Sequence, residues 1–263
     1  MNIGEHNRAA WDAEAERGNR WTVPVSPEAI EAARHGDWDI LLTPTKPVPR
    51  DWLQGISGRR VLCLASGGGQ QAPILAAAGA IVTVLDNSPK QLERDVLLAQ
   101  KHDLAIKPVL GDMADLGAFP SESFEVIVHP VSNCFVHDVQ PVWRETFRVL
   151  RQGGDLLSGF SNPVVYVFDR RLAERAGRLE VKNSLPYSDL EDMVPEAIDQ
   201  LRKAGVPLEF GHTLEAQIGG QIMAGFVITG MYEDRDSPGE NSPLNAYMST
   251  YIATRARRLP GGS

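Results

Sequence analysis

The amino-acid sequence of 263 residues predicts an α/β fold, namely a doubly wound, mostly parallel sheet of seven strands. Short apolar runs alternate with segments of helical composition between residues 61 and 160, which is typical of a parallel sheet with helices on both faces. The first apolar run leads directly into a glycine-rich turn, Gly67–Gly69. After residue 212, a helix, a strand, a loop and a last strand predict an antiparallel pair that closes the sheet.

The first 54 residues precede the sheet and predict a helical cap packed on the core domain, residues 55–263. Arg8–Arg17 and Pro27–Gly36 have helical composition, and Pro27 suits the first helical position after the cap residue Ser26. The three tryptophans of this segment are expected mainly to pack on the core, although Trp21 is also a candidate to close over a bound molecule.

Five strands and their helices fill the centre of the chain. The first strand begins at Val61, and the helix after it spans Gln70–Gly79. Ser88 and Pro89 provide a cap and a proline at the first helical position, so the next helix runs to about His102. The other predicted elements are the strands Ala80–Leu85, Ala105–Leu110, Phe124–Val128 and Asp155–Phe160 and the helix Val139–Leu150.

Residues 162–212 are less regular and predict an insertion after the fifth strand, placed over the carboxyl ends of the strands as a substrate-side lid. Val164–Phe168 is a candidate edge strand, Leu179–Tyr187 an irregular segment and Leu190–Ala204 a helix that ends at Gly205. The chain then continues with the helix Thr213–Ala224, the strand Phe226–Tyr232, the acidic hairpin-like loop Glu233–Pro243 and the last strand Tyr247–Thr254.

Composition is that of an ordinary globular protein, with 43% hydrophobic and 23% charged residues. The formal net charge of −8 argues against a nucleic-acid partner, because neutralising phosphates requires an excess of Lys and Arg. Only Arg255–Arg258 is locally basic, and it is interpreted as a solvated strand end.

Sequence features that bear on location predict a cytoplasmic protein. Met1–Glu16 has no apolar core for a signal peptide, and no apolar run reaches the roughly 18 residues of a membrane helix. Cys63 and Cys134 lie in apolar surroundings without metal-ligand spacing, so we expect no metal site and a reducing compartment.

The turn Gly67–Gly69 indicates a nucleotide-type site, because glycine lets the backbone approach a ligand closely and the following helix start offers N–H groups. Asp86, at the end of the second strand, is placed to accept both hydroxyls of a ribose. Gly67, Gly69 and Ala72 also fit the dinucleotide pattern, so an NAD(P)-dependent oxidoreductase is an alternative. Three features argue against the oxidoreductase: the long N-terminal cap, the antiparallel ending of the sheet and Asp112. A carboxylate at the position of Asp112 is suited to bind an adenine amino group.

In this combination the residues resemble the class I S-adenosylmethionine-dependent methyltransferases, from about Leu53 to the C-terminus. The resemblance implies a Rossmann-like methyltransferase fold and S-adenosylmethionine as cofactor, with the loop on its methionine part, Asp86 on its ribose and Asp112 on its adenine. The strand Phe124–Pro130 and the turn Val149–Gly154 complete the family's order of motifs. The implied cofactor residues are Ala65, Ser66, Gly67, Gly68, Gly69, Asp86, Asn87, Asp112, Met113 and His129.

Two positions depart from the family pattern. Cys63 stands where the family usually has an acid in the first strand, and Ala65 replaces the first glycine of the loop. We expect Ala65 to keep the turn with a negative φ. A SAM-binding protein without turnover therefore remains a second alternative.

By the same resemblance, His129–Asn133 faces the glycine loop across the cofactor. Methyl transfer is an in-line displacement for which the protein supplies alignment and a dry site, and a base is needed only for a protonated acceptor. His129 is the first candidate base, with structural bonding to a backbone carbonyl as its alternative, and His137 is a weaker one. Asn133 could orient the acceptor, and Trp21, Tyr187 and His212 are candidate substrate contacts.

The sequence thus predicts a SAM-dependent methyltransferase that acts on O, N, S or C of a small-molecule acceptor. The acidic composition disfavours nucleic acid, and the insertion favours an enclosed pocket over a protein substrate. No segment indicates a membrane partner, and the oligomeric state is left open.

Overall fold

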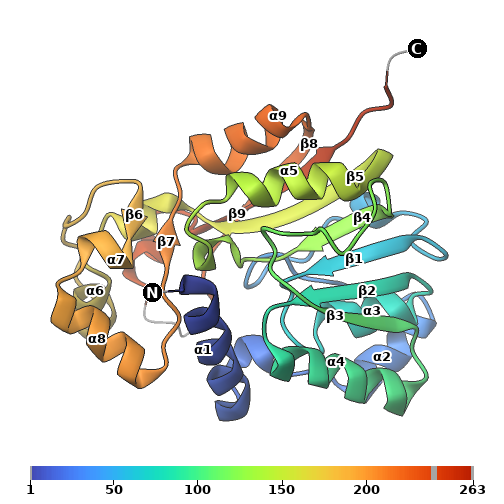
Figure 1. Cartoon of the computed structure of the whole chain (residues 1–263), viewed down its shortest axis with the longest axis horizontal. Helices are drawn as coiled ribbons and strands as arrows, with labels where there is room; N and C mark the ends of the chain where they lie inside the picture. The colour runs from blue at the N-terminus through green and yellow to red at the C-terminus, as the bar shows by residue number, and fades with distance from the viewer. Residues whose placement is uncertain (1, 238–241, 262–263) are drawn as a thin grey trace.

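The computed structural model describes residues 2–237 and 242–261, and in them seven strands form one twisted sheet (Figure 1). Five of the strands are parallel, whereas the strand nearest the C-terminus runs antiparallel to both of its neighbours. In spatial order they are β3 (Ile106–Leu110), β2 (Ile81–Asp86), β1 (Arg60–Leu64), β4 (Phe124–His129), β5 (Leu150–Ser161), β9 (Tyr251–Arg257) and β8 (Val227–Asp234). The predicted sheet and its closing antiparallel strands are confirmed.

Helices cover both faces of the sheet, as predicted. On one face lie α2 (Pro27–Arg34), α3 (Gln71–Ala77) and α4 (Pro89–His102), and on the other α5 (Gln140–Val149) and α9 (Gly220–Ala224). Alternate residues of β1 enter the two cores: Val61 and Cys63 pack on the first face, Leu62 and Leu64 on the second. A strand buried on both faces reads as a continuous apolar run, which is why β1 is visible in the sequence.

The N-terminal helix α1 (Ile3–Arg17) begins five residues before the predicted start at Arg8, because Asn2 caps it by accepting from the Glu5 N–H. α1 packs against α4. Asp12 of α1 accepts hydrogen bonds from the Ser88 hydroxyl at 2.6 Å and the Lys90 N–H at 3.1 Å, both at the start of α4. The N-terminal segment is therefore tied to the helix that follows β2.

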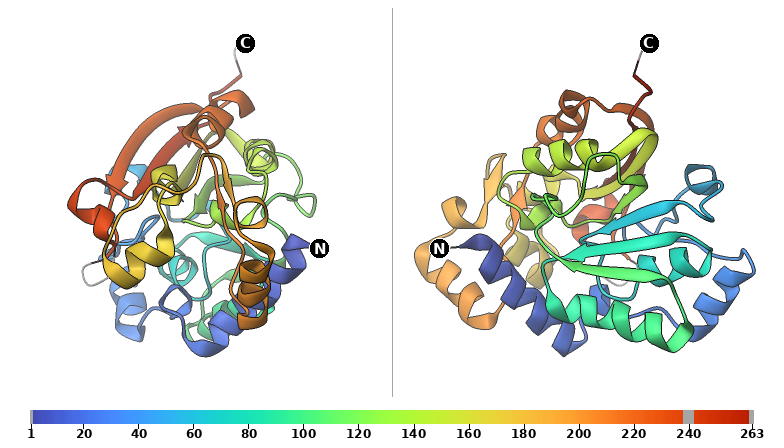
Figure 2. Two further views of the ribbon diagram at one scale, coloured as in Figure 1. Left: turned by 90° about the vertical axis from the view of Figure 1, so that its left-hand side faces the viewer. Right: turned by 45° about the vertical axis from the view of Figure 1, so that its right-hand side comes forward.

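The inserted segment, residues 162–212, lies with α1 beside the carboxyl ends of the parallel strands (Figures 1 and 2). The predicted edge strand Val164–Phe168 is wrong: Asn162 caps a short 3₁₀ helix, η4 (Pro163–Tyr166), whose first residue is a proline. The rest contains α6 (Arg170–Ala176), β6 (Tyr187–Ser188), α7 (Asp189–Asp192), α8 (Pro195–Ala204) and β7 (Phe210–Gly211). The predicted helix Leu190–Ala204 is divided into α7 and α8.

Near the C-terminus the predicted helix Thr213–Ala224 consists of a π-helical turn, Glu215–Gly219, followed by α9. β9 begins at Tyr251, later than the predicted Tyr247, because Pro243–Ala246 forms a 3₁₀ helix before it. Part of the predicted loop Glu233–Pro243 lies outside the described residues.

The basic segment Arg255–Arg258 is not a solvated strand end. Arg257 and Arg255 donate to the carboxylate of Asp155, whose side chain is 3% exposed on the adjacent strand β5. Hydrogen bonds from these arginines outweigh the effect of burial and lower the pKa of Asp155. The arginines therefore fasten β9 to β5. Within the described ranges, no helix is long and apolar enough to cross a membrane.

Candidate active site

A cavity of about 890 Å³, called here the main cavity, lies at the carboxyl ends of β1, β2 and β4. Its wall combines residues of the first 44 positions, the loop after β1, the turn after β4 and the inserted segment. A second cavity of about 270 Å³, the side cavity, lies against the start of α1 and the ends of β2 and β3. The residues that line both are Ala65, Asp86, Asn87, Met113 and Phe135, so the two cavities adjoin.

Ala65 opens the loop after β1 with a φ of +45°, so the expected negative φ is wrong. Its N–H donates to the Leu85 carbonyl at 2.8 Å, which fixes the loop against the end of β2. Gly67 follows with a φ of +71°, and a Cβ there would lie 2.7 Å from the Trp21 carbonyl oxygen. Ala65, Ser66 and Gly67 line the main cavity, as expected of cofactor-binding residues.

Gly68 and Gly69 line neither cavity, and their N–H groups donate to side chains of α4. The Gly68 N–H donates to Gln91 Oε1 at 2.8 Å, and the Gly69 N–H donates to Asp95 Oδ1 at 2.9 Å. A Cβ on Gly68 would lie 2.3 Å from the Gln91 carbonyl oxygen. These glycines therefore allow close packing of the loop on α4.

Asp95 anchors the loop in this structure, and the sequence analysis did not identify it. Its side chain is fully buried, and burial raises its pKa to about 8. Burial first, and then the nearby Asp95, raise the pKa of the Cys63 thiol, so a neutral thiol occupies the position of the family's acid. The only sequence signal for Asp95 is its place on the buried side of α4.

Asp86 ends β2 and lines both cavities. Its Oδ1 accepts from the Ser88 N–H at 2.9 Å, which orients the carboxylate. Burial, aided by the charge of Asp12, raises its pKa to about 6. Asn87 lies beside it on both walls.

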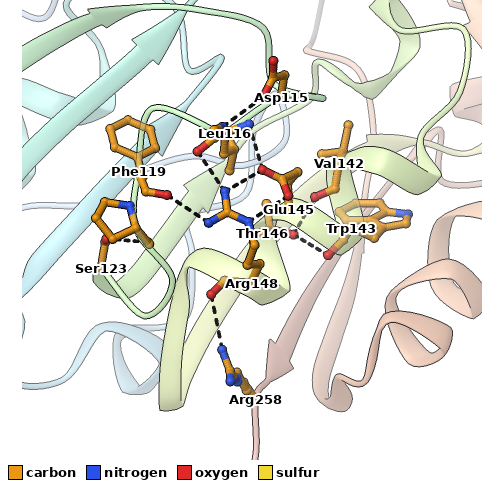
Figure 3. A network of polar contacts seen from close by, with 12 residues as sticks. Asp115, Leu116, Phe119, Ser123, Val142, Trp143, Glu145, Thr146, Arg148 and Arg258 are labelled. Atoms are coloured by element: carbon orange, nitrogen blue, oxygen red, sulfur yellow. Dashed lines mark hydrogen bonds and ion pairs between the residues drawn. The ribbon is translucent and has the colours of Figure 1, made fainter.

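Asp112 and Met113 follow β3 and line the side cavity. Asp112 Oδ1 accepts from the Ala114 N–H at 2.9 Å and thereby turns the chain. The loop is held to α5 by Arg148, which donates to the carbonyls of Leu116 and Phe119, both at 2.9 Å, and pairs with Glu145 at 2.7 Å (Figure 3).

Comparison with known proteins agrees with this arrangement. A family profile described as "Methyltransferase domain" matches residues 62–158. The chain is 55% identical over 254 residues to a protein of Bacillus subtilis named "Uncharacterized methyltransferase YbaJ", covering 97% of this chain and 98% of that protein. The chain belongs to the class I S-adenosylmethionine-dependent methyltransferases. Its cofactor is S-adenosylmethionine, and the oxidoreductase alternative is set aside.

Solved structures share the fold of this methyltransferase. An S-adenosylmethionine-dependent methyltransferase from Mesorhizobium loti is 21% identical with a TM-score of 0.60, covering 80% of this chain and 95% of that one. A 1,6-didemethyltoxoflavin-N1-methyltransferase from Burkholderia thailandensis is 14% identical with a TM-score of 0.57, covering 98% and 89%.

His129 and Asn133 line neither cavity of the methyltransferase, so their roles as catalytic or cofactor contacts stay predictions. Both are fully buried. His129 Nδ1 lies 2.9 Å from the Leu64 carbonyl oxygen and Nε2 lies 2.7 Å from Asn133 Oδ1, while the Asn133 amide donates to Gln217. Burial lowers the pKa of His129. Its side chain points into the protein body and ties β4 to β1.

The other candidate residues lie in different places. Trp21 is 39% exposed on the main cavity, with the Arg20 guanidinium over its ring. His137 lines the side cavity and packs edge-on against Phe210. Tyr187 and His212 line neither cavity: Tyr187 stacks behind Tyr166, and His212 Nε2 lies 3.0 Å from the carbonyl oxygens of Asn133 and Val136.

The wall contributed by the inserted segment contains an ion pair that the sequence analysis missed. Arg170 pairs with Glu209 at 2.7 and 3.0 Å, and the Tyr166 hydroxyl donates to Glu209 at 2.9 Å. The side chains of Arg170 and Glu209 remain 40% and 24% exposed. Because both residues line the main cavity, this polar group faces its interior.

The main cavity also presents polar atoms suited to the cofactor. Ser66 Oγ and Gln71 Oε1 are buried without a hydrogen-bond partner, and both residues line this cavity. The Asp86 carboxylate lies where the two cavities adjoin, and its oxygens are acceptors of the kind that ribose hydroxyls need. The residues present therefore fit S-adenosylmethionine.

Proposed function

We propose that the methyltransferase acts on a small-molecule acceptor bound in the main cavity, next to the cofactor's methyl group. The observation that carries the proposal is the wall of the 890 Å³ cavity, which joins the loop after β1 to the inserted segment. A pocket of this volume is in the range that holds small ligands. Residues 162–212 then act as the substrate-side lid, and residues 1–54 as the cap.

In this proposal the cofactor spans both cavities. Ala65, Ser66 and Gly67 contact its methionine part, Asp86 and Asn87 its ribose, and Asp112 and Met113 its adenine in the side cavity. The ribose hydroxyls are donors to the ionised Asp86 carboxylate. Trp21 covers the cofactor from the N-terminal side.

The bound cofactor supplies an electrophilic methyl group, and the protein residues align the acceptor with it and exclude water. Tyr166, Phe168 and Leu179 give the acceptor side an apolar and aromatic lining, and the Arg170–Glu209 pair gives it one polar group. We therefore expect an acceptor with a largely apolar body and at least one polar substituent. Among the described residues, no histidine lines the main cavity.

The test is transfer of a labelled methyl group from S-adenosylmethionine to a panel of small phenols, thiols, amines and carbon acids, with tRNA and a histone mixture as macromolecular controls. We expect transfer to at least one small molecule and none to the macromolecules. Labelled tRNA or protein with unlabelled small molecules would contradict the proposal. The net charge of −8 supports the expectation that no methyl group is transferred to tRNA.

A further inference from the structure

In this family the acid at the position of Cys63 is a common partner of the cofactor's amino group, and this chain lacks that acid. Cys63 occupies that position, and its buried thiol is neutral because burial raises its pKa. A buried ammonium group without acceptors is strongly unfavourable. The chain must therefore supply another acceptor near the loop after β1.

Three carboxylates of this region already have other roles. Asp95 lies behind the loop and lines neither cavity, and one of its oxygens accepts from Gly69. Asp86 is placed on the ribose, and Glu209 is engaged by Arg170 and Tyr166.

Gln71 has an acceptor oxygen next to the loop after β1. It is the first residue of α3, immediately after the loop, it is 7% exposed, and it lines the main cavity. Its Nε2 donates to the Leu41 carbonyl oxygen at 3.0 Å, which fixes the orientation of the amide. Its Oε1 is buried and accepts no hydrogen bond. An unpaired buried amide oxygen is unfavourable, and a donor on a bound ligand removes that cost.

Ser66 is the other cavity residue of this loop with an unpartnered oxygen. Its hydroxyl can rotate and can both donate and accept. An amide oxygen can only accept, so Gln71 is the more specific partner for a cation.

We propose that Gln71 Oε1 accepts a hydrogen bond from the amino group of the cofactor's methionine part and replaces the missing acid at Cys63. The inference rests on the proposed placement of the cofactor along the loop Ala65–Gly67. In this proposal Gln71 is a cofactor-binding residue.

Three ligands separate this role from a structural one. S-Adenosylhomocysteine carries the amino group and the carboxylate, decarboxylated S-adenosylhomocysteine carries only the amino group, and methylthioadenosine carries neither. In isothermal titration, the Gln71→Leu variant should bind the two ligands that carry the amino group, called here the amines, about 10- to 100-fold more weakly than wild type. This is the expected effect of losing a hydrogen bond to a charged group. The affinity for methylthioadenosine should change less than about threefold.

Two further variants complete the test. Gln71→Glu restores an acceptor and should bind both amines at least about fivefold more tightly than Gln71→Leu. Gln221→Leu removes a buried glutamine of α9 that lines neither cavity, and it should leave the ratio of the amine to methylthioadenosine affinities unchanged. Thermal unfolding of each variant verifies folding.

Equal weakening of all three ligands by Gln71→Leu, or unchanged amine binding, would overturn the inference. Wild-type protein that binds none of the three ligands would instead refute the proposed placement of the cofactor. The two failures are therefore distinguishable.

Discussion

Asp95 of α4 and Gly69 of the loop after β1 are joined by a hydrogen bond of 2.9 Å from the glycine N–H to the carboxyl oxygen. The loop is thus anchored from the helix that follows β2, although Cys63 in β1 lacks a carboxylate. The second oxygen of Asp95 is buried without a partner. Together with a pKa of about 8, this indicates a protonated carboxyl group at neutral pH.

The Asp95→Asn variant should therefore keep the loop anchor, because a side-chain amide also offers an oxygen to the Gly69 N–H. Between about pH 4 and pH 8 the folded wild type retains a proton that the unfolded chain has released, so its free energy of unfolding decreases as pH rises. The variant lacks this dependence. Urea unfolding at pH 5 and pH 8 should show the variant gaining on the order of 1–3 kcal/mol relative to wild type. Parallel pH curves would contradict a raised pKa.

Asp86 should make cofactor binding depend on pH. Its pKa of about 6 in the free protein means that lower pH protonates the carboxylate that accepts from the ribose. The affinity for S-adenosylhomocysteine should be constant above pH 7 and decrease about tenfold per pH unit below the pKa. Titration calorimetry from pH 5 to pH 8 measures it. Asp86→Asn should bind more weakly at pH 8 and show a flat profile, and a sloping profile in that variant would assign the titration to another group.

Ala65→Gly should stabilise the protein. An L-residue in the left-handed region costs about 1–2 kcal/mol, and glycine recovers this at the expense of about 0.4–1 kcal/mol of unfolded-state entropy. With Ala65 at φ +45°, a net gain of roughly 0.5–1 kcal/mol is expected in urea unfolding. Ala99→Gly within α4 is the matched control and should lose about 1 kcal/mol. A loss of similar size at both positions would show that Ala65 is not strained.

The sheet could be predicted because its strands are buried on both faces and read as apolar runs between turn signals. Ala65 shows the limit of loop prediction: replacing a glycine by alanine does not change the backbone conformation that the turn requires. The secondary structure of the inserted segment was predicted poorly for another reason. Its short helices η4 and α6 are set by the capping residues Asn162 and Asp169 rather than by apolar periodicity.

The position of three candidate cofactor residues was predictable, because Asp86 ends β2 and Asp112 and Met113 lie just after β3, at the edge where the carboxyl ends of the parallel strands meet. The same rule does not say where a side chain points, and the His129 side chain points into the protein body, where Nδ1 lies 2.9 Å from the Leu64 carbonyl oxygen. The contacts of Gln71 with Leu41 and of Arg170 with Glu209 join residues far apart in the sequence, so no local sequence pattern predicts them.

Replacing Asp155 should be among the more destabilising single changes in the chain. Asp155→Ala leaves Arg255, whose side chain is 17% exposed, without its carboxylate partner between β5 and β9. Removing one member of a buried ion pair typically costs about 3–5 kcal/mol. Urea unfolding at pH 7 measures this loss.

Glu122→Ala provides the exposed control on the same part of the chain. Glu122 pairs with Arg258 at 2.9 Å but is 44% exposed, so its removal should cost less than about 1 kcal/mol.

Because the arginines lower the pKa of Asp155, the stabilising effect of Asp155 is complete above the pKa of the unfolded chain. The effect is lost as pH falls through the folded pKa. The difference between wild type and Asp155→Ala should therefore shrink below about pH 4. Equal losses for the two variants at pH 7 would show that burial does not strengthen the β5–β9 pair.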